Sequence, residues 1–233
     1  MPWGELFVKG DRNVPRRRRL KVALFDLDGT LVDTEEQYTV FWGAMARKYR
    51  PDVPKLEFLI KGTTLTQIFD TYFPDPQWQA EITAGLNAWE AQMRYDFYPG
   101  ALAMLEDLKR NGVKCAVVTS SNVPKMESVR RQIPQFDSLF DKVLTAEDFT
   151  ASKPAPDCYL LGARTFEADI DECVVFEDAY TGLQAGMSSG IFTIGLASCH
   201  TREELQGKCD YVLDGFDGMS YEKLVGILSS EHQ

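Results

Sequence analysis

The stretch Phe25-Asp26-Leu27-Asp28-Gly29-Thr30-Leu31-Val32-Asp33 places two carboxylates two residues apart, directly after the apolar run Lys21–Phe25. That run has the length and composition of a buried β-strand. Burying two carboxylates without a cation is costly, so their position at a strand end indicates a cation site. An acidic turn is the simpler alternative, because Asp-Gly is a favourable turn dipeptide.

A calcium-binding EF-hand loop also begins with this pattern, but the residues that follow exclude it. A loop that began at Asp26 would need a glycine where Leu31 stands and a closing glutamate where Gln37 stands. Helices would flank such a loop, whereas a strand signal precedes Asp26.

Five further strand signals follow, each a short apolar run closed by polar or turn residues. They are Val113–Val118, Lys142–Leu144, Glu172–Phe176, Ile191–Ile194 and Tyr211–Leu213. Helical signals separate most of them. One helix is predicted to open at Pro99-Gly100-Ala101 and to end at Asn111-Gly112, with Leu102, Leu105 and Leu108 as its buried stripe. This alternation predicts an α/β fold with a doubly wound, Rossmann-like parallel sheet.

The alternation stops between residues 34 and 98, where helical periodicity carries many aromatic residues and no strand signal occurs. We expect this segment to be an inserted α-helical cap domain above the carboxyl end of the sheet. Residues 20–33 and 99–233 then form the core domain. Residues 1–19, with the run Arg16–Arg19, are expected to be a flexible, solvated leader. The aromatic residues should form the core of the cap, with a ligand-stacking face as the alternative.

The composition limits the possible partners. Lys and Arg number 25 against 35 Asp and Glu, a formal charge of -10 that would repel nucleic acid. A compact anionic substrate stays possible, because a metal ion and a few cations can reverse the local field. No apolar run approaches the roughly 18 residues of a membrane helix, so we expect a cytoplasmic monomer with no membrane partner.

The cysteines and histidines give no sign of a zinc or redox centre. The five cysteines include no Cys-x-x-Cys pair, and only two histidines, His200 and His232, are present. Free thiols in a reducing compartment are therefore expected.

Three more polar fragments each follow a strand signal. Thr119-Ser120-Ser121-Asn122 offers hydroxyl and amide groups for phosphoryl oxygens, although Ser121 or Asn122 could simply cap the next helix. Lys153 lies in a proline-rich loop, and Glu177-Asp178 adds two carboxylates. The glycines after them, at positions 182, 186 and 190, are expected to let a helix approach the sheet closely.

These four fragments, in this order between Lys21 and about Leu228, resemble the four motifs of the haloacid dehalogenase superfamily. The segments Phe25–Thr34, Lys153–Asp157 and Phe176–Ala179, together with the helical insert, are similar to the β-phosphoglucomutase-like branch with its small α-helical cap.

The resemblance implies a Mg²⁺-dependent phosphoryl transfer. Asp26 would attack phosphorus to form an aspartyl-phosphate, and Asp28 would act as general acid and base. The metal ligands would be Asp26, the backbone carbonyl of Asp28, and Asp178, with Glu177 either touching the metal or supporting its ligands. The aspartate at position 28 disfavours two other classes of the superfamily, because haloalkanoate dehalogenases lack an acid there and transport ATPases resemble Asp-Lys-Thr instead.

The resemblance also assigns the phosphate-binding groups and the specificity loop. Thr119 and Lys153 would bind the phosphoryl oxygens, and Ser120 would add a backbone N–H. The segment Lys61-Gly62-Thr63-Thr64 resembles the cap loop that faces the active site, and Asn122 is a further candidate for substrate contact. Lys61 could read a second anionic group or be a solvated surface lysine.

The substrate is expected to be a small phosphorylated metabolite. A sugar phosphate is the preferred candidate, and a nucleotide or pyrophosphate is the alternative. A phosphatase is favoured over a β-phosphoglucomutase-like mutase, because two mutase residues are absent. Tyr38 stands where the mutases have a histidine, and Leu65 stands where they have a cap arginine. A non-catalytic phosphate-binding module is the remaining alternative, although no core motif position has been lost.

Overall fold

The computed structural model describes residues 19–230, so most of the expected leader lies outside the described residues. Within this range a parallel sheet has the strand order β3-β2-β1-β4-β5-β6. The strands are β1 Val22–Phe25, β2 Lys114–Val118, β3 Lys142–Leu144, β4 Cys173–Glu177, β5 Phe192–Leu196 and β6 Tyr211–Leu213. The predicted doubly wound α/β fold is confirmed. Its topological switch point lies at β1, where such sheets form a crevice at their carboxyl ends.

Helices cover both faces of the sheet because alternate side chains of each strand point to opposite faces. On one face, side chains such as Phe25 and Val117 pack with α5 (Ala101–Arg110), α6 (Val123–Gln132) and α11 (Tyr221–Ser230). On the other face, side chains such as Leu24 pack with α8 (Asp157–Thr165) and α9 (Tyr180–Ser189). The shorter helices are α7 Phe136–Leu139, η2 Ile170–Glu172 and α10 Arg202–Leu205.

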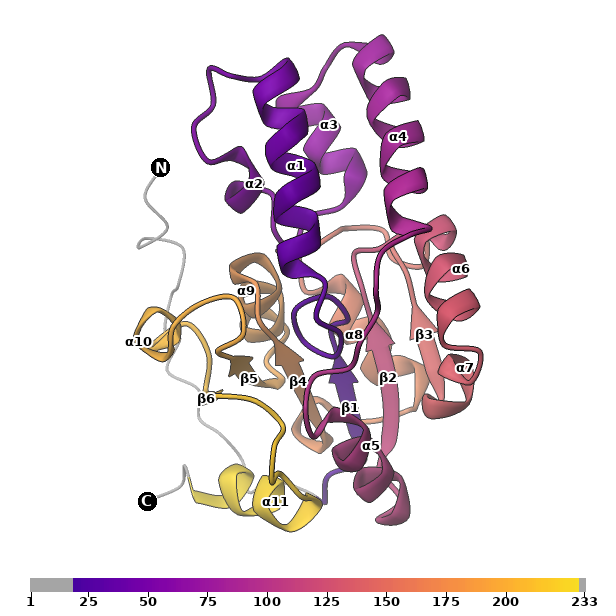
Figure 1. The fold of residues 1–233 in the computed structure, drawn as a ribbon. Helices are drawn as coiled ribbons and strands as arrows, with labels where there is room; N and C mark the ends of the chain where they lie inside the picture. Colours follow the sequence, from indigo (N-terminus) through magenta and orange to yellow (C-terminus); the bar gives the residue numbers. More distant parts are fainter. Residues whose placement is uncertain (1–18, 231–233) are drawn as a thin grey trace.

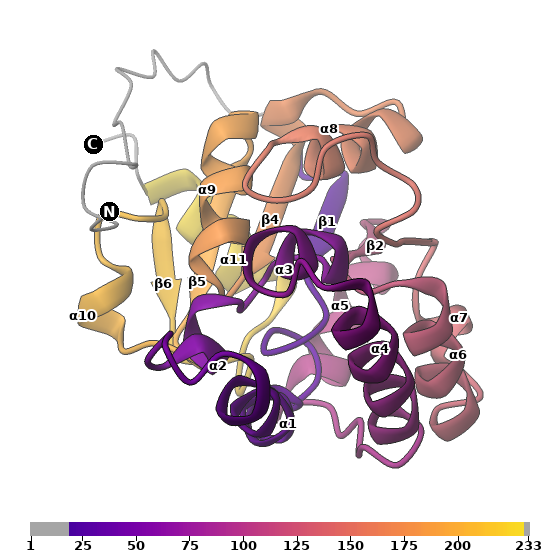
Figure 2. The ribbon, with the colours of Figure 1, turned by 90° about the horizontal axis from the view of Figure 1, so that it is seen from above.

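Four helices form a separate layer above the carboxyl ends of the strands (Figure 1). They are α1 Glu35–Tyr49, α2 Leu56–Leu59, α3 Leu65–Tyr72 and α4 Pro76–Glu90. In Figure 2, which looks down on this layer, α1, α3 and α4 lie in front of the strands. Phe41, Trp42 and Phe73 belong to a hydrophobic cluster internal to the layer. The aromatic residues therefore mainly build this core, as expected.

The two segments that join the cap to the core lie side by side. The Asp33 amide donates to the Asp96 carbonyl at 2.9 Å, and the Tyr98 amide donates to the Leu31 carbonyl at 2.9 Å. Val32 and Phe97 form an antiparallel bridge. This pairing supports the proposal, made from the sequence, that residues 34–98 form the cap domain.

Helix α5 departs from the prediction in one respect. Leu102 is exposed, and the buried residues are Ala101, Met104, Leu105 and Leu108. These four follow the i, i+3, i+4, i+7 spacing of one helix face, and Leu102 lies beside that face. The predicted end of the helix is confirmed, with Asn111 as C-cap and Gly112 at a φ of 77°.

Two expectations about composition can be compared with the described residues. All five cysteines are free. Between residues 19 and 230, no helix combines the length and the hydropathy that crossing a bilayer requires.

The glycines of α9 serve two different purposes. A Cβ atom at Gly186 would lie 2.6 Å from Thr193 Oγ1 and 3.2 Å from Val175 Cγ1, so only glycine allows this approach to β4 and β5. Gly190, by contrast, is the C-cap of the helix and has a φ of 81°, which glycine adopts without strain.

We predict that Gly186→Ala lowers the free energy of unfolding by about 1–3 kcal/mol, because the added methyl group overpacks a closed interface. The matched control is Gly226→Ala in α11, where a Cβ would meet no atom within 4 Å. That change should raise stability by about 0.5–1 kcal/mol through helix propensity. Urea unfolding of both variants measures the difference, and equal effects would contradict the packing argument.

Candidate active site

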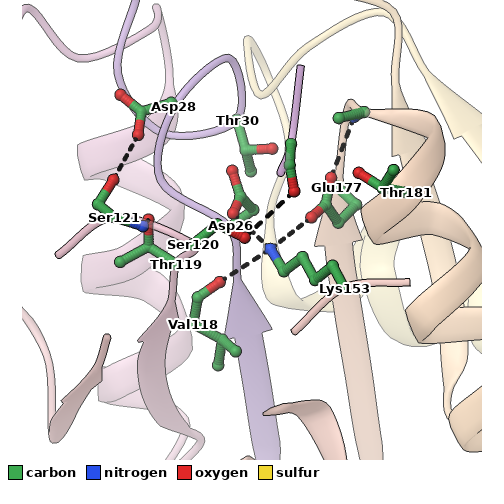
Figure 3. A network of polar contacts seen from close by, with 12 residues as sticks. Asp26, Asp28, Thr30, Val118, Thr119, Ser120, Ser121, Lys153, Glu177 and Thr181 are labelled. Atoms are coloured by element: carbon green, nitrogen blue, oxygen red, sulfur yellow. Dashed lines mark hydrogen bonds and ion pairs between the residues drawn. The ribbon is translucent and has the colours of Figure 1, made fainter. Parts of the chain in front are cut away.

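The centre of the site is the side chain of Lys153, which is completely buried. Its ammonium donates to Asp26 Oδ1 at 2.6 Å, to Glu177 Oε1 at 2.6 Å and to the carbonyl of Val118 at 3.1 Å (Figure 3). Asp26 follows β1 directly, Glu177 ends β4 and Val118 ends β2. The parallel sheet thus brings together Asp26, Lys153 and Glu177, which belong to three different motifs. Their positions next to strand ends in the sequence predicted this convergence.

Glu177 is held by more donors than Lys153 alone. Its Oε1 also accepts from the Tyr159 hydroxyl at 2.9 Å, and its Oε2 accepts from the backbone amides of Asp178 and Ala179 at 2.9 and 3.0 Å. Four donors fill the acceptor sites of one carboxylate. A Cβ at Gly182 would lie 1.7 Å from Oε1, so this glycine leaves room for the carboxylate. The arrangement favours a supporting role for Glu177 over direct metal contact.

Asp178 is the third buried carboxylate of the site. The hydroxyl of Thr30 donates to Asp178 Oδ1 at 2.9 Å. Gly29 has a φ of 79°, and a Cβ there would lie 2.3 Å from Asp178 Oδ2. Asp26, Glu177 and Asp178 each place a carboxylate oxygen within 4.8 Å of the others. The predicted metal-binding side chains therefore converge.

The site is short of positive charge. Burial raises the pKa of Asp26 to about 8, and the opposing effect of Lys153 does not cancel this. Burial and the neighbouring carboxylates also raise the pKa of Asp178 well above its ordinary value. Burial would lower the pKa of Lys153, but Asp26 and Glu177 outweigh it, so the pKa is raised and the ammonium stays charged. Buried oxygen donors with this deficit fit a hard divalent cation such as Mg²⁺.

Asp28 lies at the edge of the site and points away from Asp26 (Figure 3). The Thr34 hydroxyl donates to its Oδ1 at 2.6 Å, and the Ser121 hydroxyl donates to its Oδ2 at 3.0 Å. The ammonium of Lys125 also donates to Oδ2. Lys125 was not predicted from the sequence. A lysine in the first turn of a helix opposes the helix dipole, which is the one weak signal that it has another partner.

In the second motif, residues 119–122, one side chain bonds to the cap domain and another is the N-cap of helix α6. Thr119 is buried, and its hydroxyl oxygen accepts from the Ser121 amide at 3.0 Å. The Ser120 hydroxyl donates to the carbonyl of Gly62 in the cap at 3.2 Å. Asn122 borders the cavity, and its side-chain oxygen caps α6 through the Lys125 amide at 3.0 Å. The N-cap alternative therefore holds for Asn122.

The predicted specificity loop, residues 61–64, lies over the site. Gly62 has a φ of 72°, and a Cβ there would lie 2.4 Å from Thr181 Oγ1. The Thr63 hydroxyl donates to the Ile60 carbonyl at 2.5 Å, and Thr64 caps α3 in a capping box with Gln67. The hydroxyls of this loop thus fix its own conformation. Gln67, also not predicted, donates to the Lys153 carbonyl at 2.9 Å.

Lys61 is neither solvated nor free to attract an anion. Its ammonium lies 2.5 Å from Glu35 Oε2, and its side chain is only 17 % exposed. Both residues border a cavity of about 390 Å³ between cap and core. The positive charge of Lys61 is therefore balanced by a carboxylate of the same chain.

Tyr38 and Leu65, which replace the two mutase residues, also border this cavity. The Tyr38 hydroxyl donates to Glu90 Oε1 at 2.8 Å, and Glu90 is buried. Leu65 contributes an apolar wall at the start of α3. Trp42 and Phe69 line the same space, so part of the aromatic cap core also faces the cavity.

Comparisons with known proteins agree with this geometry. Residues 23–196 match the model of a family described as haloacid dehalogenase-like hydrolase. Hexitol phosphatase A of Escherichia coli (strain K12) is 31% identical over 76% of this chain and 83% of its own length. The β-phosphoglucomutase of Bacillus subtilis (strain 168) is 26% identical over 76% and 83%.

A solved structure of a hydrolase from Pseudomonas syringae has the same fold, with a TM-score of 0.76 at 21% identity, covering 90% of this chain and 100% of that one. The family match spans all four motifs, and Asp26 of the first and Glu177 of the fourth contact Lys153 of the third. The chain therefore belongs to the haloacid dehalogenase-like hydrolase family.

Proposed function

We propose that this chain is a Mg²⁺-dependent phosphatase that hydrolyses a small phosphate monoester, most suitably a sugar or sugar alcohol phosphate, through an aspartyl-phosphate. The observation that carries the proposal is the position of Asp26. Its carboxylate follows β1, lies 2.6 Å from the Lys153 ammonium and faces Asp178 across a buried oxygen cluster. The similarity to hexitol phosphatase A supports the substrate class.

In the first step a carboxylate oxygen of Asp26 bonds to phosphorus while the bond to the ester oxygen breaks. Asp28 gives its proton to that departing oxygen, so the product leaves as a neutral alcohol. Lys153 offsets the repulsion between the Asp26 carboxylate and the phosphate dianion. Thr119, with the backbone of Ser120, holds the phosphoryl oxygens at the end of β2.

In the second step water attacks phosphorus, and Asp28, now a carboxylate, takes its proton. The bond between phosphorus and the Asp26 oxygen breaks, which regenerates Asp26 and releases inorganic phosphate. Asp26, Asp178 and the backbone carbonyl of Asp28 would hold the Mg²⁺. A bound Mg²⁺ supplies positive charge to the phosphoryl oxygens, and Glu177 orients its surroundings.

The cavity supports a substrate with a single phosphate. Its lysines, Lys61 and Lys125, are paired with Glu35 and Asp28, and Glu57 and Glu90 add further negative charge to the lining. A second phosphate on the substrate would meet no unpaired cation among the described residues of this lining. An uncharged polyol with one apolar face suits both the carboxylates and the apolar walls.

A mutase is the second candidate, because the β-phosphoglucomutase of B. subtilis is also a relative. A mutase must keep water from its aspartyl-phosphate until a second hydroxyl arrives, so its cap has to grip the distant phosphate. Tyr38 and Leu65 replace the histidine and the arginine expected for that task. One paired lysine gives less geometric control than a guanidinium fork.

Asp26→Asn should lower the rate of phosphate release by at least about 10³-fold, because the amide oxygen is a poor nucleophile. The change keeps the shape of the side chain, and the thermal unfolding of the variant should show a folded protein. Asp137→Asn, at a surface residue paired with Arg130, is the control and should keep full activity. Substantial turnover by folded Asp26→Asn would sink the assignment, and a wild-type protein that releases no phosphate from any monoester would favour a binding module.

Removing Mg²⁺ with a chelator should abolish turnover, and adding it back should restore it. Asp178→Asn should bind Mg²⁺ too weakly to detect by calorimetry, because a ligand is lost. Glu177→Gln should instead lower the free energy of unfolding by about 1–3 kcal/mol, because glutamine keeps only one acceptor oxygen. Either the two backbone amides or Lys153 and Tyr159 then lose their acceptor. Full activity after chelation, or wild-type Mg²⁺ affinity in Asp178→Asn, would contradict the proposed metal site.

The choice between phosphatase and mutase is tested with β-glucose 1-phosphate and a glucose bisphosphate activator. We expect inorganic phosphate to appear faster than glucose 6-phosphate, because water can reach an aspartyl-phosphate that the cap does not seal. Both products are followed in the same reaction. Isomer that forms much faster than free phosphate would overturn the phosphatase in favour of the mutase.

A further inference from the structure

Lys125 is a buried cation to which the four motifs assign no task. It lies in the first turn of α6 and is 3 % exposed. Its ammonium donates to Asp28 Oδ2 and lies 4.6 Å from the centre of the Tyr38 ring. Asp28 belongs to the core, whereas Tyr38 belongs to helix α1 of the cap. One ammonium therefore contacts both domains.

Three donors hold the Asp28 carboxylate, one at the start of cap helix α1 and two in the core. Thr34 donates to one oxygen at 2.6 Å, while Ser121 and Lys125 donate to the other. Asp28 and Lys125 both border the cavity between cap and core, which is the space open to a leaving group. Asp28 is therefore held where a leaving group in the cavity could take its proton, and it does not point toward Asp26.

The cap side of Lys125 is equally well defined. The Tyr38 hydroxyl donates to Glu90 Oε1 at 2.8 Å, and the Tyr95 hydroxyl donates to the Glu90 carbonyl at 2.8 Å. Through these bonds the Tyr38 side chain, which extends from α1, is fixed to Glu90 at the end of α4. A fixed aromatic face near an ammonium that is shielded from water contributes a cation–π attraction.

We propose that Lys125 is a positioning residue that holds Asp28 toward the leaving-group oxygen and ties this orientation to the cap through Tyr38. The inference rests on the proposed function, in which Asp28 protonates the leaving group. Lys125 stays protonated throughout and exchanges no proton with the substrate. Loss of Lys125 should leave Asp26 and the Mg²⁺ ligands in place but let the Asp28 carboxylate turn away.

Two esters of nearly the same shape test this directly. Phenyl phosphate needs a proton on its leaving oxygen, whereas 4-nitrophenyl phosphate releases a much weaker base and needs little help. In Lys125→Met, kcat/KM, which covers the steps up to the aspartyl-phosphate, should fall at least about tenfold more for phenyl phosphate than for 4-nitrophenyl phosphate, as expected for impaired general acid catalysis. KM should change little for either ester.

Two further variants complete the test. Lys114→Met removes a surface lysine paired with Asp141. It is the control and should leave the ratio of the rates on the two esters unchanged. If Lys125→Met does not fold, Tyr38→Leu decides, because it removes the aromatic face and should shift the ratio of the two rates in the same direction. Tyr38→Phe loses only the bond to Glu90 and is its control, which should leave the ratio unchanged. Equal losses on both esters in a folded variant overturn the role of Lys125. A wild-type enzyme that hydrolyses neither ester would instead refute the proposed function.

Discussion

The ammonium of Lys153 is the interaction on which the rest of the site depends. It bonds to Asp26, Glu177 and the Val118 carbonyl, and so joins the carboxyl ends of β1, β4 and β2. Breaking a buried ion pair by removing one partner costs about 3–5 kcal/mol, because the other charge stays buried and unpaired. Yet one ammonium cannot balance Asp26, Glu177 and Asp178 together. The remaining negative charge is what suits the site to a divalent cation and, with it, to a phosphate.

The cap is anchored around the same lysine. Gln67 donates to the Lys153 carbonyl at 2.9 Å, Ser120 donates to the Gly62 carbonyl at 3.2 Å, and Thr181 donates to the Lys61 carbonyl at 3.4 Å. The last two bonds use backbone carbonyls of Lys61 and Gly62, so they hold residues 61–64 against the core whatever the side chains of this loop are. The loop thus borders the cavity on one side, while residues of α1, α3 and α4 form much of its remaining wall.

Much of the fold and the centre of the site were predictable because their signals are local. Asp26 and Thr119 each follow a strand directly, Glu177 ends one, and a parallel sheet necessarily brings such ends together. The buried stripe of α5 was predicted less well. Leu102 and Met104 are both apolar, so periodicity alone did not tell which of them faces the core.

Contacts between distant elements could not be predicted in this way. Lys125 and Asp28 are 97 residues apart, and Gln67 and Lys153 are 86 apart. Neither contact can be read from the spacing of residues along the chain or from the local composition. The pairing of Lys61 with Glu35 was missed for the same reason, and it changes the interpretation of the cavity, because a lysine that could have bound a second anion is already neutralised.

The central claim is that Asp26, at the end of β1 and beside Lys153, carries the phosphoryl group during turnover. It is tested most directly by quenching the reaction within milliseconds and reducing the mixture with borohydride, which converts an aspartyl-phosphate into homoserine. Peptide mass spectrometry should then find homoserine at position 26 alone, in an amount that rises when substrate is saturating. Homoserine at position 28, or phosphate release with no homoserine at any position, would contradict the account.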